Sequence, residues 1–74
     1  MLGKLKIGEK GKIEDLSKAD RLVRRRLLDL GITEGTEVSI KGIMPFGGPF
    51  MLESYGQCVG IRRREALQIK VEKI

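Results

Sequence analysis

The side chains with the clearest chemical potential in this sequence are its arginines, which all fall in two clusters. The first cluster comprises Arg21, Arg24, Arg25 and Arg26, and the second is the run Arg62-Arg63-Arg64. Arginine holds carboxylates and phosphates through paired N–H donors, so either cluster could face an anion or an acidic partner. A solvated charge run is the simpler interpretation of the second cluster, and an anion-facing patch is the alternative.

Residues for catalysis or metal binding are scarce. The chain has no His and a single Cys, and its carboxylates are dispersed without a pair at acid–base spacing. It therefore cannot build a Cys/His zinc or iron–sulfur site or a His-dependent nucleophile. Its Gly-Lys pairs lack the glycine spacing and the Ser/Thr of a phosphate loop. We expect no enzyme, no cofactor and no metal site, and we expect Cys58 to pack as a small apolar residue.

Length and charge limit the class of protein further. The 74 residues, with 15 basic and 10 acidic side chains, support one domain over residues 1–74 with a formal charge of +5. The apolar runs are far shorter than the ~20 residues that span a bilayer, and none resembles a signal peptide. One Cys is typical of a reducing compartment. We expect a cytoplasmic monomer or weak homo-oligomer that does not insert into a membrane.

One amphipathic helix is predicted over residues 18–30. Ser17 is the predicted N-cap, and Gly31 supplies the left-handed residue that ends a helix. The apolar face, predicted to be buried, comprises Ala19, Leu22, Val23, Leu27 and Leu30. Arg26 interrupts this face, either with a guanidinium that reaches solvent or a carboxylate, or as a fixed cation that orients a partner. Leu28 lies opposite, either as an ordinary exposed leucine or as a partner contact.

The remaining segments alternate apolar and polar residues, as strands do. Strands are predicted over residues 12–15, 37–43, 50–55, 57–62 and 67–71. In the last strand, Leu67, Ile69 and Val71 are predicted to face inward. Short strands separated by turns favour a small barrel, because closing the sheet removes its exposed edges. The predicted fold is therefore mainly β, a barrel of about five strands with one inserted helix.

Residues 44–50, Met-Pro-Phe-Gly-Gly-Pro-Phe, form the most distinctive segment of the chain. Gly47-Gly48 between Pro45 and Pro49 predicts a turn between two strands. Phe46 and Phe50 flank this turn. The segment is either an ordinary hairpin connection or a partner-binding loop that presents Phe46.

Several of these segments carry a family resemblance. The run RRLLDLGITEGTEV, residues 25–38, resembles the R-L-x-x-L-G-(hydrophobic)-x-x-G-x-x-V pattern of the FeoA family of small ferrous iron transport proteins. Further along, Pro45 with Gly48-Pro49, and then Gly60-Ile61-Arg62-Arg63 with Glu65-Ala66 and Ile69 to Val71, resemble the family's P-x-x-G-P and (L/I)-R-(R/K)-x-E-A-x-x-I-x-V segments. The resemblance extends over residues 5–71.

The resemblance implies an SH3-like barrel and a partnership with FeoB, the membrane ferrous iron transporter that carries a cytoplasmic G-protein domain. We therefore expect an accessory protein that regulates or scaffolds a FeoB-like transporter. The expected partner contacts are Arg24, Arg25, Leu28, Pro45, Phe46, Phe50, Arg62 and Arg63. The alternative is a small basic barrel that binds nucleic acid. Few aromatic residues and a charge of only +5 count against that alternative, so no nucleic-acid partner is expected.

Overall fold

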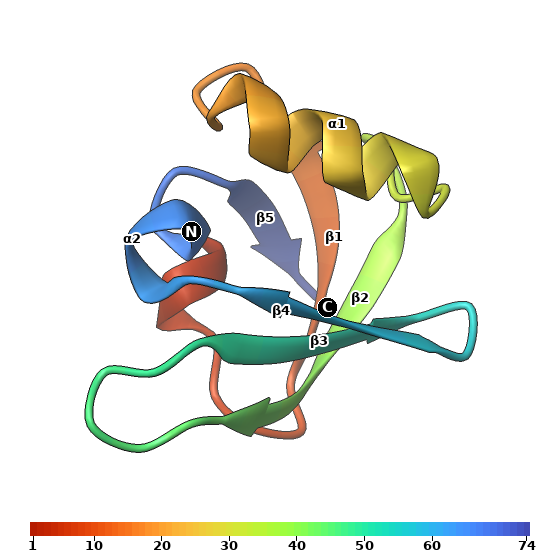
Figure 1. Ribbon diagram of the computed structural model, residues 1–74. Coiled ribbons are helices and arrows are strands. Elements are labelled where there is room, and N and C mark those ends of the chain that lie inside the picture. Colours follow the sequence, from red (N-terminus) through yellow and green to blue (C-terminus); the bar gives the residue numbers. More distant parts are fainter.

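The computed structural model describes all 74 residues and contains a five-stranded antiparallel sheet with an inserted helix. In chain order the elements are η1 (Leu2–Lys4, a 3₁₀ helix), β1 (Lys10–Asp15), α1 (Arg21–Asp29), β2 (Glu37–Ile43), β3 (Phe50–Ser54), β4 (Gln57–Ile61), α2 (Arg63–Ala66) and β5 (Lys70–Lys73). The strand order is β4-β3-β2-β1-β5. Figure 1 shows α1 across one end of the sheet. The mainly β class with one inserted helix is confirmed.

Two irregularities curl the sheet into a barrel. The register shifts between Ile13 and Asp15 where β1 pairs with β5, and between Ile40 and Gly42 where β2 pairs with β3. Such bulges bend a strand and increase its twist. The outermost strands, β4 and β5, are joined through α2, which packs beside η1 (Figure 1). A helical turn therefore covers the gap between the two ends of the sheet.

The core fills the inside of this curl with alternate strand residues. β2, β3 and β4 each bury every second side chain, as the alternation in the sequence predicts. The buried apolar side chains of the strands are Ile13, Val38, Ile40, Phe50, Leu52, Val59, Ile61 and Val71. Val23 and Leu27 of α1 cover one end of this core, and Leu2 of η1 is completely buried elsewhere in it. Sequence patterns gave no indication of η1.

α1 begins later than predicted because Asp20, and not Ser17, is its N-cap. Asp20 Oδ2 accepts a hydrogen bond from the Leu22 N–H at 3.1 Å, whereas the Ser17 N–H donates to Asp15 Oδ1 at 2.8 Å. The helix contacts the barrel along a narrow stripe through Val23 and Leu27. Leu22 lies beside this stripe and is 74% exposed, so the prediction that it is buried was wrong.

The segment before β5 also differs from the prediction. Residues 63–66 form α2, whose start is closed by Glu65 Oε1 accepting a hydrogen bond from the Arg62 N–H at 3.1 Å. Leu67 follows this helical turn and is 48% exposed, so its predicted inward orientation was wrong, while Ile69 and Val71 are buried as predicted. Cys58 is exposed because the alternation of β4 turns its neighbour Val59 inward; its predicted packing was wrong.

Candidate functional site

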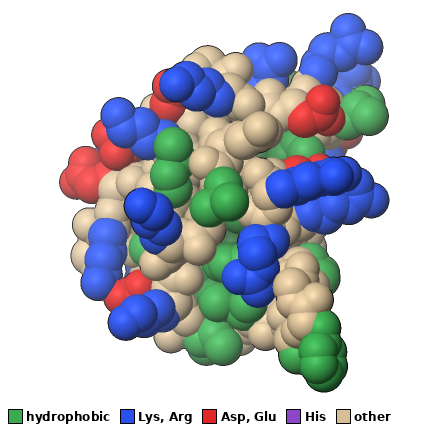
Figure 2. All heavy atoms as spheres, turned by 90° about the vertical axis from the view of Figure 1, so that its left-hand side faces the viewer, with side chains coloured by type: hydrophobic (Ala, Val, Ile, Leu, Met, Phe, Trp, Pro, Cys, Tyr) green, Lys and Arg blue, Asp and Glu red, His purple; other side chains and the backbone are tan.

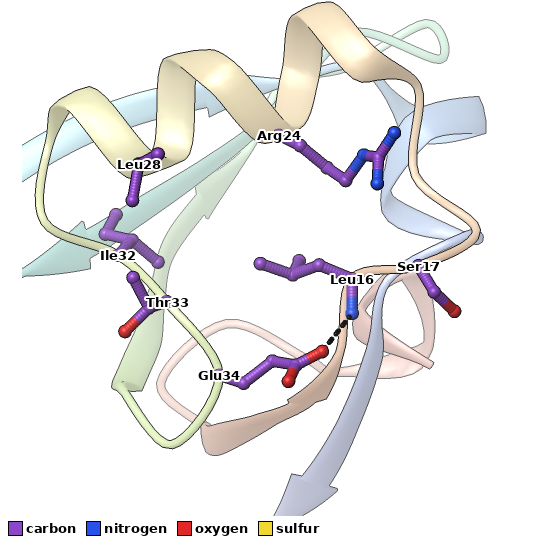
Figure 3. Close-up of a pocket in the computed structure, with 7 residues that line it drawn as sticks. All are labelled: Leu16, Ser17, Arg24, Leu28, Ile32, Thr33 and Glu34. Carbon is purple, nitrogen blue, oxygen red and sulfur yellow. Dashed lines mark hydrogen bonds between the residues drawn. The ribbon is translucent and has the colours of Figure 1, made fainter.

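A hollow of about 470 Å³ lies between α1 and the segments on either side of it (Figure 3). We call this hollow the α1 groove. Its lining comes from the segment before the helix, from the helix and from the loop after it: Leu16, Ser17, Arg24, Leu28, Ile32, Thr33 and Glu34. The groove thus depends on how the chain enters and leaves α1.

The α1 groove combines apolar walls with two charged groups. Leu28 is 60% exposed, and Leu16 is partly buried against the core. In Figure 3, Leu28 lies beside Ile32, Arg24 extends from the other end of α1, and Leu16 points into the space beneath the helix. Glu34 lies across from α1, and its Oε2 accepts a hydrogen bond from the Leu16 N–H at 3.1 Å. The carboxylate is therefore engaged by the backbone.

The helix end at Gly31 fixes the far wall of the groove. Gly31 has φ of +79°, a conformation that glycine adopts at little cost. Its N–H donates to the Leu28 carbonyl oxygen, and the Ile32 N–H donates to the Leu27 carbonyl oxygen, both at 2.9 Å. These two bonds define a Schellman motif, which brings Ile32 back against the helix. The predicted stop at Gly31 is confirmed.

A second surface surrounds the loop between β2 and β3. We call it the arginine face; it comprises Pro45, Phe46, Arg62, Arg63, Arg64 and Leu67, all of them exposed. A hollow of about 450 Å³ there is lined by residues 47–49, the three arginines and Leu67. The Arg63 guanidinium carbon lies 5.2 Å from the centroid of the Phe50 ring, close enough for a cation–π contact. None of the three arginines forms an ion pair.

The structure distributes the predicted contact residues between these two surfaces. Arg24 and Leu28 line the α1 groove, whereas Arg25 lies outside its lining and pairs with Asp29, with Nε 3.7 Å from Oδ1. The residues Pro45, Phe46, Arg62 and Arg63 belong to the arginine face. Figure 1 places α1 and the β2–β3 loop at opposite ends of the molecule. The predicted residues therefore form two sites and not one.

Phe50 requires a correction as a contact residue. It begins β3 on the same side as Leu52 and is only 1% exposed. Its side chain belongs to the core, so it cannot offer a contact surface of its own. Its ring instead supports the guanidinium of Arg63.

Arg26 links elements within the molecule. Its Nη2 donates to the Gly60 carbonyl oxygen at 3.1 Å and lies 3.8 Å from Glu65 Oε1. The interpretation in which its guanidinium reaches a carboxylate is confirmed.

Sequence reasoning missed Leu16, Ile32 and Glu34 as groove residues. The Gly31 stop was the available signal for Ile32, because a Schellman motif returns the residue after glycine to the helix.

Two carboxylates have a lowered pKa, and both stabilise local structure. A hydrogen bond from Lys73 Nζ, 2.6 Å from Oε2, holds the pKa of Glu9 below its ordinary value of 4.5, helped by the Lys6 N–H. The Ser17 N–H lowers the pKa of Asp15. Neither carboxylate lines the α1 groove or the arginine face.

No three His, Cys, Asp or Glu side chains come together as metal ligands, and no helix is long and apolar enough to cross a bilayer.

The strand order, the bulged strands and the helix inserted between β1 and β2 define a small barrel domain of the SH3-like class, the class to which a solved FeoA structure is assigned. A family model described as the FeoA domain matches residues 1–73. The chain therefore belongs to the FeoA family.

Solved structures agree with this assignment. The FeoA protein from Chlorobium tepidum is 33% identical, with a TM-score of 0.89 over 99% of this chain and 69% of that chain. A FeoA-like protein from Clostridium acetobutylicum is 36% identical, with a TM-score of 0.80 over 99% and 84%. FeoA from Stenotrophomonas maltophilia, solved in complex with zinc, is 27% identical, with a TM-score of 0.70 over 96% and 87%. A search of curated protein sequences found no match.

Proposed function

We propose that this FeoA-family chain is an accessory protein of ferrous iron transport that binds the cytoplasmic part of a FeoB-type transporter through the α1 groove. Family membership associates the chain with ferrous iron transport. The Stenotrophomonas maltophilia relative is itself described as a candidate activating factor for that process. The observation that carries the proposal is the groove, in which the exposed Leu28 and the unpaired Arg24 both come from α1.

The groove fits a short partner segment that supplies one apolar side chain and one carboxylate. Leu28 and the partly buried Leu16 would cover the apolar side chain and remove it from water. Arg24 forms no ion pair within the chain, so its guanidinium is free to hold the carboxylate through two N–H donors. A formal charge of +5 would also favour encounter with an acidic surface. The proposed partner surface is therefore apolar at its centre and acidic at its edge.

Leu28→Glu tests this proposal, with Leu22→Glu as its matched control. Both leucines lie on α1 and are more than half exposed, but only Leu28 lines the groove. We expect Leu28→Glu to weaken binding to the purified transporter by about tenfold or more, because a charge would replace a central apolar contact. Leu22→Glu should bind as the unmodified chain does. Titration by surface plasmon resonance measures both, and undiminished binding by Leu28→Glu would remove the groove from the proposal.

A second measurement separates regulation from scaffolding. GTP hydrolysis and iron uptake by the reconstituted transporter are compared with and without this protein. A regulator changes at least one of the two rates, and Leu28→Glu should reduce that change at equal protein concentration. A scaffold binds through the same groove and leaves both rates unaltered.

A further inference from the structure

We propose that the arginine face docks on an anionic lipid bilayer, with Arg62, Arg63 and Arg64 facing the headgroups and Phe46 reaching the boundary with the acyl chains. This surface lies away from the α1 groove, so the inference does not depend on where a transporter binds. It requires no membrane-spanning segment.

The first observation is that Phe46 is fully exposed, at 104% of its reference surface. Its ring covers none of the core, and Leu67 and Met44 of the same region are also exposed, at 48% and 40%. Met44 and Phe46 lie in the loop after β2, and Leu67 lines a hollow with residues 47–49 of that loop; exposed apolar patches mark contact sites with proteins or membranes. Phenylalanine is among the side chains that membrane-surface proteins bury at the boundary between headgroups and acyl chains.

The second observation is the charge around this loop. The three arginines form no ion pairs, and the two carboxylates that share a hollow with Arg62 and Arg64 are already engaged. Glu65 accepts the Arg62 N–H and lies near Arg26, while Asp20 caps α1. Figure 2 shows Lys and Arg side chains spread over the face that carries α2 and the β2–β3 loop, with Asp and Glu side chains at its left and upper right and hydrophobic side chains projecting at its lower edge. Basic and apolar groups therefore meet on one surface, as they do in proteins that bind anionic membranes.

The third observation is the hollow that separates the loop from the arginines. It measures about 450 Å³, and its lining includes the backbone of Gly47 and Gly48 together with the arginine run. Arg63 is held at its rim by the ring of Phe50. The lining of this hollow is mostly apolar, and the arginines that contribute to it carry guanidinium N–H donors, which bind phosphate oxygens in pairs. The arginine face thus offers a phospholipid an apolar hollow beside phosphate-binding side chains, and the exposed Phe46 lies in the same loop as Gly47 and Gly48.

Tyr55 provides an internal comparison, because the two turns share their backbone geometry. Phe46-Gly47 have φ of 59° and 74°, and Tyr55-Gly56 have φ of 53° and 77°. Tyr55 is also exposed, at 74%, but the hollow beside it is lined by Glu37 and Glu53 together with one lysine. Figure 1 shows the two turns on opposite sides of the molecule. The hollow beside the Phe46 turn is lined by three arginines and no carboxylate, whereas two carboxylates offset the single lysine beside Tyr55.

The chain contains no Trp, so a single introduced Trp reports its own environment. Phe46→Trp and Tyr55→Trp are mixed with vesicles of phosphatidylcholine alone or with phosphatidylglycerol added. We expect the fluorescence of Phe46→Trp to shift to the blue only with phosphatidylglycerol, and the shift to diminish at high salt because salt screens the headgroup charge. Tyr55→Trp should not shift. No shift for Phe46→Trp, or equal shifts for both variants, would overturn the proposal.

Vesicle flotation of the full chain gives the contribution of each group. Phe46→Ala should bind the anionic vesicles about tenfold more weakly, because it loses the aromatic ring that the proposal places partly within the bilayer. The double variant Arg62→Gln/Arg64→Gln should bind the anionic vesicles more weakly, by about fivefold for each arginine replaced. Leu28→Glu should float as the unmodified chain does, which separates this proposal from transporter binding.

Inorganic phosphate and a single-stranded oligonucleotide are added to Phe46→Trp without vesicles. If either reproduces the blue shift, the surface binds free phosphate or nucleic acid and the bilayer proposal fails.

Discussion

Two phenylalanines four residues apart illustrate how position decides the role of a side chain. Phe50 starts β3 and is buried, whereas Phe46 occupies the first central position of the turn before it and is fully exposed. The Gly48 N–H donates to the Pro45 carbonyl oxygen at 3.1 Å, which closes this turn. Both central residues have positive φ, as in a type I′ turn, where Asn, Asp or Gly is preferred. A phenylalanine there is strained and gains no packing energy in return.

Phe46→Gly is therefore expected to stabilise the fold while removing the proposed membrane contact. Relief of about 1–2 kcal/mol of left-handed strain exceeds the roughly 0.5–1 kcal/mol that glycine adds to the chain entropy of the unfolded state. We expect the free energy of unfolding in urea to rise by roughly 0.5–1 kcal/mol. Phe46→Ala keeps the positive φ of a non-glycine residue and is the control that should show no such gain. A loss of stability in Phe46→Gly would mean that the ring packs in the folded protein.

At the level of elements, α1 owes the position of its last turn to Gly31. The Schellman motif satisfies two carbonyl groups of the helix end and directs Ile32 into the core, where it is 1% exposed. The far wall of the α1 groove therefore depends on the conformation of one residue. The space around Gly31 would accommodate a Cβ atom, so the constraint is its positive φ alone.

Gly31→Ala tests this dependence. We expect the free energy of unfolding to fall by about 1 kcal/mol or more, because alanine disfavours the left-handed conformation. Thermal unfolding followed by circular dichroism measures the loss. Lys18→Ala, an exposed position before α1, is the control and should change little. Amide exchange at Ile32 and Thr33 should accelerate in Gly31→Ala, and unchanged exchange there would show that the helix end does not hold the groove.

At the level of the whole molecule, an ion pair joins the N-terminal segment to the last strand. Glu9 precedes β1 and contacts Lys73 of β5, and its other oxygen, Oε1, accepts the Lys6 N–H at 2.8 Å. The lowered pKa of Glu9 means that the unfolded chain binds more protons than the folded chain just below pH 4.5. Stability from this contact is therefore complete above that pH and is lost as the pH falls through the lowered pKa.

Glu9→Gln should remove this part of the acid sensitivity. We expect its melting temperature to be lower than that of the unmodified chain at neutral pH, and the difference to shrink as the solution is acidified below about pH 4.5. Differential scanning calorimetry across this range measures the effect. Glu72→Gln, on the same strand as Lys73 but without an ion pair, is the control. A difference that stays constant with pH would contradict the assigned role of Glu9.

Local patterns in the sequence determined the class of the fold and most of its elements. Alternation gave β2 with its observed bounds and gave β3 and β4 to within one residue at their ends, because a buried face requires every second side chain to be apolar. Gly31 marked the end of α1. The Phe46 turn was expected from its glycines and prolines. These features depend on neighbouring residues alone, which is why the sequence contains enough information to predict them.

Tertiary structure decided the rest, because the relevant partners are far apart in the chain. Leu22 is exposed because the barrel contacts α1 along only one stripe, whereas the cap at Asp20 rests on a local hydrogen bond that sequence reasoning missed. The α1 groove joins Leu16 to Ile32, and the arginine face joins the loop after β2 to the run after β4. Only the curl of the sheet brings these segments together, and it divides the predicted contact residues between opposite ends of the molecule.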